Sequence, residues 1–115
     1  MSSNFVHLHV HSHYSLLDGL AKIPELLDEA KRQGMESLAI TDHGAMYGVV
    51  EFYLKAKEVG IKPIIGVETY LAANGMANKR AGVDRKSNHL VLIAKNFAGY
   101  QNLMYLTSQA HLKVY

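Results

Sequence analysis

Four of the seven histidines of this chain stand at alternate positions in one short stretch, at His7, His9, His11 and His13. Alternate side chains of a β-strand share a face, and side chains two residues apart lie about 6.6 Å apart along the strand. Imidazoles at that spacing can hold one metal ion or bridge neighbouring ions, and imidazole suits Zn, Fe, Ni and Cu. The spacing therefore favours a metal site. The alternative is a solvent-facing edge strand in which the histidines have no chemical role.

Further residues of the metal-ligand type stand where later predicted strands end. Asp42 and His43 follow the strand expected at residues 36–41, and Glu68 follows the strand expected at residues 61–67. In α/β folds with parallel strands, working residues gather where strands end and the following loops begin. Each motif is weak alone, but three successive strand ends would bring these residues to one rim with His9 and His11. Together they predict a His/carboxylate metal cluster.

The elements that must position this cluster alternate between strands and helices. Apolar patterning predicts strands at residues 4–10, 36–41, 61–67 and 90–94, the last of them a continuous apolar run typical of a strand buried on both faces. A helix is expected to begin at Pro24 and stop at Gly34, and a second to follow the stripe from Val49 and stop at Gly60. A polar loop spans residues 73–88, and a last helix carries a stripe from Tyr100 to Ala110. This order predicts βαβ units and a parallel sheet.

Composition narrows the class of protein. The chain has 115 residues, 49% of them hydrophobic and 19% charged, which is ordinary for one globular domain or part of one. A net charge of +2 is too small to indicate nucleic-acid binding by the overall field. No cysteine is present, so disulfides and thiolate metal sites are excluded. The sequence has neither a membrane-length apolar run nor a signal-peptide pattern, and we expect a cytoplasmic protein without membrane contact.

Several stretches resemble the PHP domain (polymerase and histidinol phosphatase) family, in the branch found at the N-terminus of bacterial DNA polymerase III alpha subunits. They cover nearly the whole chain in the expected order. The stretches are Phe5–Ser12, Tyr14–Gly19, Ala39–Gly44, Gly66–Glu68, His89–Asn96 and Gly99–Met104.

The resemblance implies a (β/α)7 TIM-like barrel that holds divalent metal ions, with Zn or Mn expected and Mg as an alternative. Carried over by position, the metal ligands are His9, His11, Asp18, His43, Glu68 and His89. Asp42 would lie beside the site and orient His43. His89 precedes its apolar run, so either the loop before it folds over the site or its strand runs against the others. A complete barrel needs about 250 residues, so residues 1–115 are expected to be an N-terminal fragment of about four βα units with an incomplete metal cluster.

The resemblance leaves three functional alternatives. The parent would be a DNA-directed DNA polymerase, whose polymerase carboxylates lie outside this chain, and the PHP site would support phosphoester hydrolysis as a 3′–5′ proofreading exonuclease or a pyrophosphatase. Alternatively, the metal would staple a non-catalytic module that docks other polymerase domains or a proofreading exonuclease subunit. A stand-alone phosphatase of the histidinol-phosphate kind is a weaker alternative. For the fragment itself we expect little catalysis, and self-association through open strand edges.

The remaining candidate residues are expected to be structural. His7 is predicted to be a buried supporting residue, His13 to face solvent or the loop, and His111 to act as a cation at a helix end. The basic stretch at residues 79–86 is interpreted as a solvated loop, with contact to a nucleic-acid backbone as the alternative. Three tyrosines near strand ends would line either a substrate groove or the core, namely Tyr14, Tyr47 and Tyr70.

Overall fold

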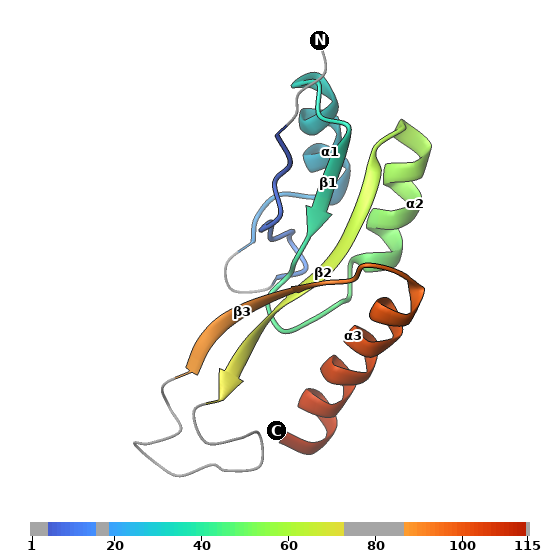
Figure 1. Ribbon diagram of the computed structural model, residues 1–115. Helices are drawn as coiled ribbons and strands as arrows, with labels where there is room; N and C mark the ends of the chain where they lie inside the picture. Colours follow the sequence, from blue (N-terminus) through green and yellow to red (C-terminus); the bar gives the residue numbers. More distant parts are fainter. Residues whose placement is uncertain (1–4, 16–18, 73–86, 115) are drawn as a thin grey trace.

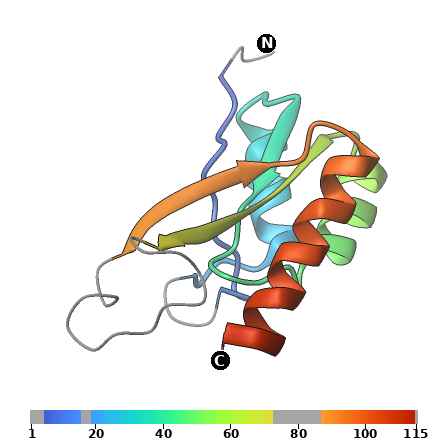
Figure 2. The ribbon, with the colours of Figure 1, turned by 60° about the horizontal axis from the view of Figure 1, so that its bottom comes forward.

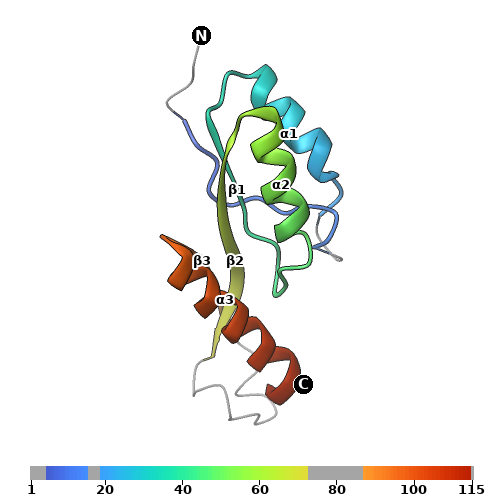
Figure 3. The same cartoon turned by 90° about the vertical axis from the view of Figure 1, so that its right-hand side faces the viewer.

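The computed structural model describes residues 5–15, 19–72 and 87–114. Its elements are α1 (Ile23–Arg32), β1 (Ser37–Ile40), α2 (Val49–Val59), β2 (Lys62–Ala72), β3 (Ser87–Ile93), α3 (Phe97–Gln109) and the π-helix η1 (Ala110–Val114). Figure 1 shows their arrangement, and Figure 3 shows α1 and α2 together on one face of β1 and β2. The expected mixed α/β class is confirmed for the described part of the chain. Among these residues there is no helix of the length and apolarity that spanning a membrane requires.

The helices begin and end where local chemistry predicts. Pro24 stands in the first turn of α1, where its missing N–H costs no hydrogen bond. Past the end of α1, Gly34 adopts a φ of 78°, and Gly60 closes α2 at a φ of 81°. These left-handed conformations favour glycine because it has no Cβ. Asn96 caps α3 by accepting a hydrogen bond from the backbone N–H of Gly99 at 3.0 Å.

The core lies between the two N-terminal helices and the first two strands. Its buried members are Ile23, Leu27, Ala30, Leu38, Ile40, Val49, Phe52, Ala56 and Ile61. They come from the apolar stripes of α1 and α2, from β1 and from the residue before β2. Burial of these stripes holds α1 and α2 against β1 and fixes the loops that leave the strand ends.

The sheet differs from the parallel arrangement that the sequence predicts. Its order is β1-β2-β3: β1 and β2 run parallel, with Ser37 opposite Lys62, but β2 and β3 run antiparallel, with Gly66 opposite Ile93. Pairing with β3 explains why β2 extends past the expected end at Val67 to Ala72. Figure 2 shows this long two-stranded ribbon with α3 beside it. The prediction that the strand at residues 90–94 is buried on both faces is wrong, since Leu90 and Ile93 are about two-fifths exposed.

The histidine-rich stretch is not the regular strand that was expected at residues 4–10. Its described residues lie beside β1, where Ala39 donates a hydrogen bond to the His7 carbonyl and Thr41 donates one to the Val10 carbonyl. His7 and Val10 are three residues apart while Ala39 and Thr41 are two apart, so one extra residue interrupts the ladder, as in a β-bulge. The backbone N–H of Val10 donates instead to the buried Thr41 hydroxyl at 2.8 Å.

Candidate metal centre

Glu68 is the buried centre of the candidate site. It lies inside β2, where its backbone N–H donates to the Asp42 carbonyl at 3.0 Å and its own carbonyl accepts from Gly44 at 2.8 Å. An isolated parallel bridge thus joins His43 to Glu68 beyond the end of β1. Only 3% of the Glu68 side chain is exposed. A carboxylate this deeply buried must be paired, because an isolated charge in such a place costs several kcal/mol or more, on the order of its desolvation penalty.

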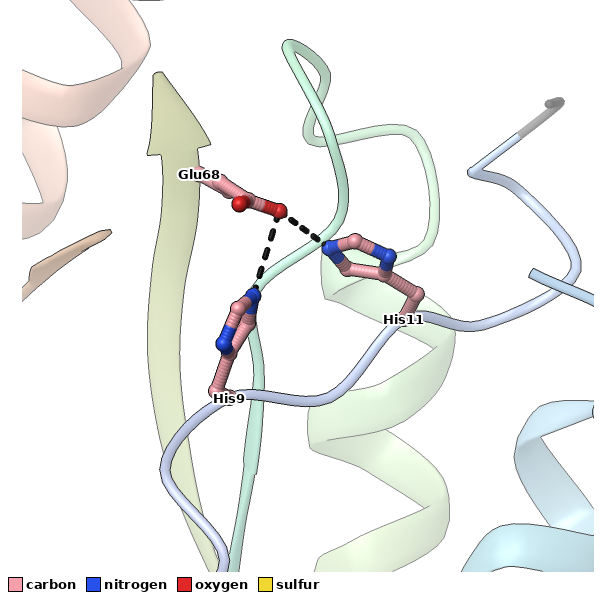
Figure 4. A group of neighbouring side chains, drawn as sticks. All are labelled: His9, His11 and Glu68. Carbon is pink, nitrogen blue, oxygen red and sulfur yellow. Dashed lines mark hydrogen bonds and ion pairs between the residues drawn. The ribbon is translucent and has the colours of Figure 1, made fainter. Parts of the chain in front are cut away.

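Three imidazoles supply that pairing. His9 Nε2 lies 3.2 Å and His11 Nε2 lies 2.5 Å from the same oxygen, Oε2 of Glu68. Figure 4 shows both rings turned toward this carboxylate. His89 Nδ1 approaches the other oxygen, Oε1, at 2.9 Å. His9 and His89 are more than half exposed, so the cluster is open to solvent on one side and closed at Glu68 on the other.

The charge on Glu68 is stabilised by these neighbours. Burial acts to raise the pKa of its carboxyl group, whereas hydrogen bonds from His9 and His11, and the positive charge of those rings when protonated, act to lower it. The lowering effects together outweigh burial, so the pKa of Glu68 lies below its ordinary value of 4.5. Glu68 is therefore an ionised carboxylate near neutral pH, which is the form that binds cations.

His43 joins the same cluster by ring contacts. Its ring is stacked with the ring of His11 at a centroid distance of 6.0 Å and meets the ring of His89 edge-on at 5.2 Å. Its backbone N–H donates to the hydroxyl of the buried Ser15 at 3.1 Å. Of the six sequence-predicted ligands, five lie together and Asp18 lies outside the described residues.

The antiparallel direction of β3 accounts for His89. Of the two explanations that the sequence left open, the described residues favour the reversed strand, since His89 stands opposite Tyr70 in the β2–β3 ladder. Tyr70 shares the Glu68 face of β2 because it is two residues further along. Its ring contacts those of His43 and His89 at 4.7 and 5.0 Å. Tyr70 is thus an aromatic neighbour of the cluster, and about half of it is exposed.

Asp42 makes a buried contact that the sequence did not predict. Its two oxygens accept hydrogen bonds from Ser12: Oδ1 from the backbone N–H at 2.5 Å and Oδ2 from the hydroxyl at 2.7 Å. Both residues are buried. Asp42 therefore holds the backbone directly after His11, and its expected role in orienting the His43 ring stays a prediction.

Sequence reasoning missed the two serines that shape the histidine segment. Ser15 donates its backbone N–H to the Ser12 carbonyl at 2.9 Å, which closes a tight turn, and Ser12 Oγ also accepts from the backbone N–H of Tyr14 at 3.2 Å. Both serines are at most 1% exposed. The available signal was the Ser-x-x-Ser spacing within the motif, because serine hydroxyls commonly bond nearby backbone groups in turns.

Two histidines of the stretch stay outside the cluster. His7 is exposed, with its ring edge-on to Phe5 at 4.7 Å, and it lines a groove against α1 with Leu26. The prediction of a buried supporting His7 is wrong, because the extra residue after it breaks the alternation of faces. The sequence predicted that His13 faces solvent or the loop. In the structure His13 is half-buried, and its ring lies against that of Tyr14 at a centroid distance of 4.2 Å.

The donor set fits a divalent metal ion. One ligand atom each from His9, His11 and Glu68 lie within 4.8 Å of one another. Two imidazole nitrogens and a carboxylate oxygen form a combination that Zn and other transition ions bind. The nitrogens point at a single oxygen of an ionised group, so a cation placed among them would replace protons that otherwise bridge these atoms.

Comparison with known proteins places these motifs in a family. The model of the PHP domain family matches residues 7–115. Curated relatives named DNA polymerase III subunit alpha are each 50% identical to the chain, in Borreliella burgdorferi over 112 residues, in Campylobacter jejuni over 111 and in Thermus aquaticus over 113. The matches cover 95–96% of this chain but only 9–10% of each relative. The chain thus spans about a tenth of the length of these relatives.

Two solved structures are similar in fold. An amidohydrolase from Chromobacterium violaceum, solved with bound sulfate and no metal, has a TM-score of 0.60 and 26% identity, covering 90% of this chain and 34% of that protein. A putative metal-dependent phosphoesterase from Bifidobacterium adolescentis has a TM-score of 0.56 and 19% identity, covering 87% and 31%. At 19% identity, the Bifidobacterium adolescentis protein shows a similarity of fold alone.

Proposed function

Because the chain belongs to the PHP domain family, we propose that it forms the metal-binding segment of a PHP domain in a bacterial replicative DNA polymerase. The relatives named DNA polymerase III subunit alpha support the polymerase context. Residues 1–115 would be one part of a larger (β/α)7 barrel, since the chain covers about a third of each similar structure. DNA, the other polymerase domains and a proofreading exonuclease subunit are the proposed partners, in the cytoplasm.

The observation that carries the proposal is the convergence of imidazole nitrogens on the buried Glu68 carboxylate. His9, His11 and Glu68 would hold the metal, with His43, His89 and Asp18 completing the set around one ion or several. Zn or Mn suits these ligands, and Mg is the alternative. A divalent ion held here would act as a Lewis acid toward a phosphoester.

The chain's own residues would prepare the site for that chemistry. Glu68 keeps a fixed negative charge at the closed end, and the Asp42–Ser12 pair holds the backbone that carries His11. The exposed side, at His9 and His89, leaves room for a phosphoester to approach from solvent. In the parent polymerase the proposed reaction is phosphoester hydrolysis, either 3′–5′ exonuclease or pyrophosphatase.

A second candidate function is a structural one, and a specific contact favours it. The described residues before α1 form no regular strand, yet His9 and His11 tie this segment to β2 across β1. A metal ion at this point would cross-link the segment before α1 to the sheet and stabilise the folded state by its binding free energy. Such a module would serve for docking without catalysis.

Metal analysis of the purified chain separates the candidate site from a chance cluster. We expect stoichiometric Zn or Mn by mass spectrometry, lost in the His9→Ala/His11→Ala variant. His7→Ala is the matched control because His7 belongs to the same segment but lies outside the cluster. Equal metal content in all three proteins would contradict the proposed site.

Hydrolysis assays on the full-length parent then separate catalysis from structure. A catalytic site predicts that His9→Ala/His11→Ala abolishes release of nucleotides from DNA 3′ ends or of phosphate from pyrophosphate. A structural site predicts that the same variant lowers Tm on metal loss and leaves any hydrolysis unchanged. His7→Ala should match the wild-type protein in both assays.

Self-association of the chain is a further part of the proposal. β3 is an edge of the described sheet, and its free side can pair with another strand. Light scattering coupled to size exclusion at increasing concentration should show dimers or larger species. A monomer across the whole range would contradict this expectation.

A further inference from the structure

The loop from Asp42 to Gly44 carries His43 into the candidate metal centre. Most of the backbone groups of this loop make hydrogen bonds. The Asp42 carbonyl accepts from Glu68, the His43 N–H donates to Ser15, and the Gly44 N–H donates to the Glu68 carbonyl. Gly44 turns the loop at a φ of +65°, in the left-handed region that glycine adopts without strain. The carbonyl of Gly44 is the next backbone group in the loop, and its partner comes from the other end of the chain.

That partner is His111. Its Nε2 lies 2.9 Å from the Gly44 carbonyl oxygen, across a separation of 67 residues. We infer that His111 is a positioning residue for His43, holding the Gly44 carbonyl so that the His43 ring keeps its place beside His11 and His89. This inference rests on the proposed function, because it treats His43 as part of the metal centre.

The local structure around His111 supports a dedicated contact. The regular helix α3 ends at Gln109, and the chain continues as the π-helix η1, which contains His111. π-helical turns are rare and are frequent at functional sites, because the wider turn redirects side chains. Here η1 carries His111, whose Nε2 meets the Gly44 carbonyl of the loop. The His111 ring thus contacts a distant loop, and its expected role as a cation at a helix end stays a prediction.

Neighbouring contacts hold the two segments together. The ring of Tyr47 lies 6.3 Å from that of His111, and the Thr107 hydroxyl is 3.8 Å from the sulfur of Met46. These side chains line a groove between the loop and the C-terminal helix. The His111 contact is therefore part of a continuous interface, with the hydrogen bond to Gly44 at the end nearest the metal centre.

The hydrogen bond also defines the protonation of the ring. A carbonyl oxygen only accepts, so Nε2 of His111 must carry the proton in this arrangement. That nitrogen is then unable to bind a metal ion, which separates His111 from the five clustered ligand candidates. A glutamine at this position has an amide N–H₂ that can donate to the same carbonyl, whereas alanine removes the donor.

Zinc titration calorimetry on the purified chain tests the inference with three variants. We expect His111→Ala to weaken Zn²⁺ binding by up to about tenfold, the low end of the loss seen when a group bonded directly to a ligand is removed, because His111 acts through the backbone next to His43. His111→Gln should restore most of the affinity. Ser108→Ala, in the same groove, is the control and should bind as the wild-type chain does. Circular dichroism of the metal-free proteins checks that each variant folds.

A second readout is independent of metal. In ¹⁵N spectra of the metal-free chain, His111→Ala should shift the amide signals of His43 and Gly44 and speed hydrogen exchange of the Gly44 N–H, while His111→Gln leaves both near wild type. If His9→Ala/His11→Ala loses Zn²⁺ but His111→Ala binds like Ser108→Ala, the inference is overturned and the proposed function stands. If His9→Ala/His11→Ala retains Zn²⁺, the proposed function fails, and unchanged His43 and Gly44 amides in His111→Ala would overturn the inference separately.

Discussion

Removing the Asp42 carboxylate should release the histidine segment from the sheet and destabilise the chain. Asp42→Ala deletes both acceptors of Ser12, at 2.5 and 2.7 Å, inside a buried site. A hydrogen bond to a charged group contributes about 1.5–3 kcal/mol, and a donor left buried without a partner adds its desolvation cost. Two such bonds place the expected loss at roughly 3–6 kcal/mol of the free energy of unfolding.

Two milder variants measure how much of this loss comes from the Ser12 hydroxyl and how much from the charge of Asp42. Ser12→Ala removes only the hydroxyl donor and keeps the backbone N–H bond, so roughly 1.5–3 kcal/mol is expected. Asp42→Asn keeps one carbonyl acceptor but loses the charge, and we expect about 1–2 kcal/mol. Asp28→Ala, at an exposed position on α1, is the control, since surface substitutions usually change stability by less than about 0.5 kcal/mol.

Urea unfolding of the four variants and the wild-type chain, analysed by linear extrapolation, measures these free energies. A double-mutant cycle between Ser12→Ala and Asp42→Ala should give a coupling of about 1.5–3 kcal/mol. Zn²⁺ affinity should fall with Asp42→Ala, because the residue after His11 loses its anchor. An Asp42→Ala loss below about 1 kcal/mol, or one no larger than that of Ser12→Ala, would refute the assigned role of this pair.

Further predictions concern the core, the sheet and the response to pH. Phe52→Ala should lower the free energy of unfolding by about 3–5 kcal/mol in urea, because Phe52 is 1% exposed in the core. Gly66→Ala should cost roughly 1–3 kcal/mol in the same assay, because the new Cβ would lie 2.6 Å from a backbone carbonyl of β3. Hydrogen bonds from Arg32 and then Gln33 lower the pKa of Glu29 from 4.5 to about 2. Its contribution to stability is therefore complete above pH 4.5 and is lost as the pH falls toward 2, so Glu29→Gln should show a shallower acid-induced loss in that window. Zn²⁺ affinity should decrease as the pH is lowered, because protons compete for the imidazole nitrogens, and titrations at several pH values would measure this.

Much of the local structure follows from short-range patterns in the sequence. Pro24, Gly34 and Gly60 mark helix ends because their backbone preferences act within a few residues. The strand expected at residues 36–41 appears as β1 (Ser37–Ile40). A short apolar run predicts such a strand because its side chains are stable only when the fold buries them. The alternating histidines, with Asp42-His43 and Glu68, likewise indicate a metal-type cluster by their residue types and spacing alone.

Tertiary structure decided how those residues meet. The direction of β3 depends on pairing across a long loop, so only the fold could show that His89 reaches Glu68 from an antiparallel neighbour. The extra residue between His7 and Val10 has no local signature, yet it turns His7 out of the cluster. The contacts of Asp42 with Ser12 and of His111 with Gly44 join residues at least 30 positions apart. Residue type and spacing identify groups able to bind metal, because the ability to bind a metal ion is a property of the side chain itself. Which group binds, which one anchors and which one supports is determined by long-range packing, because the partners become neighbours only in the folded chain.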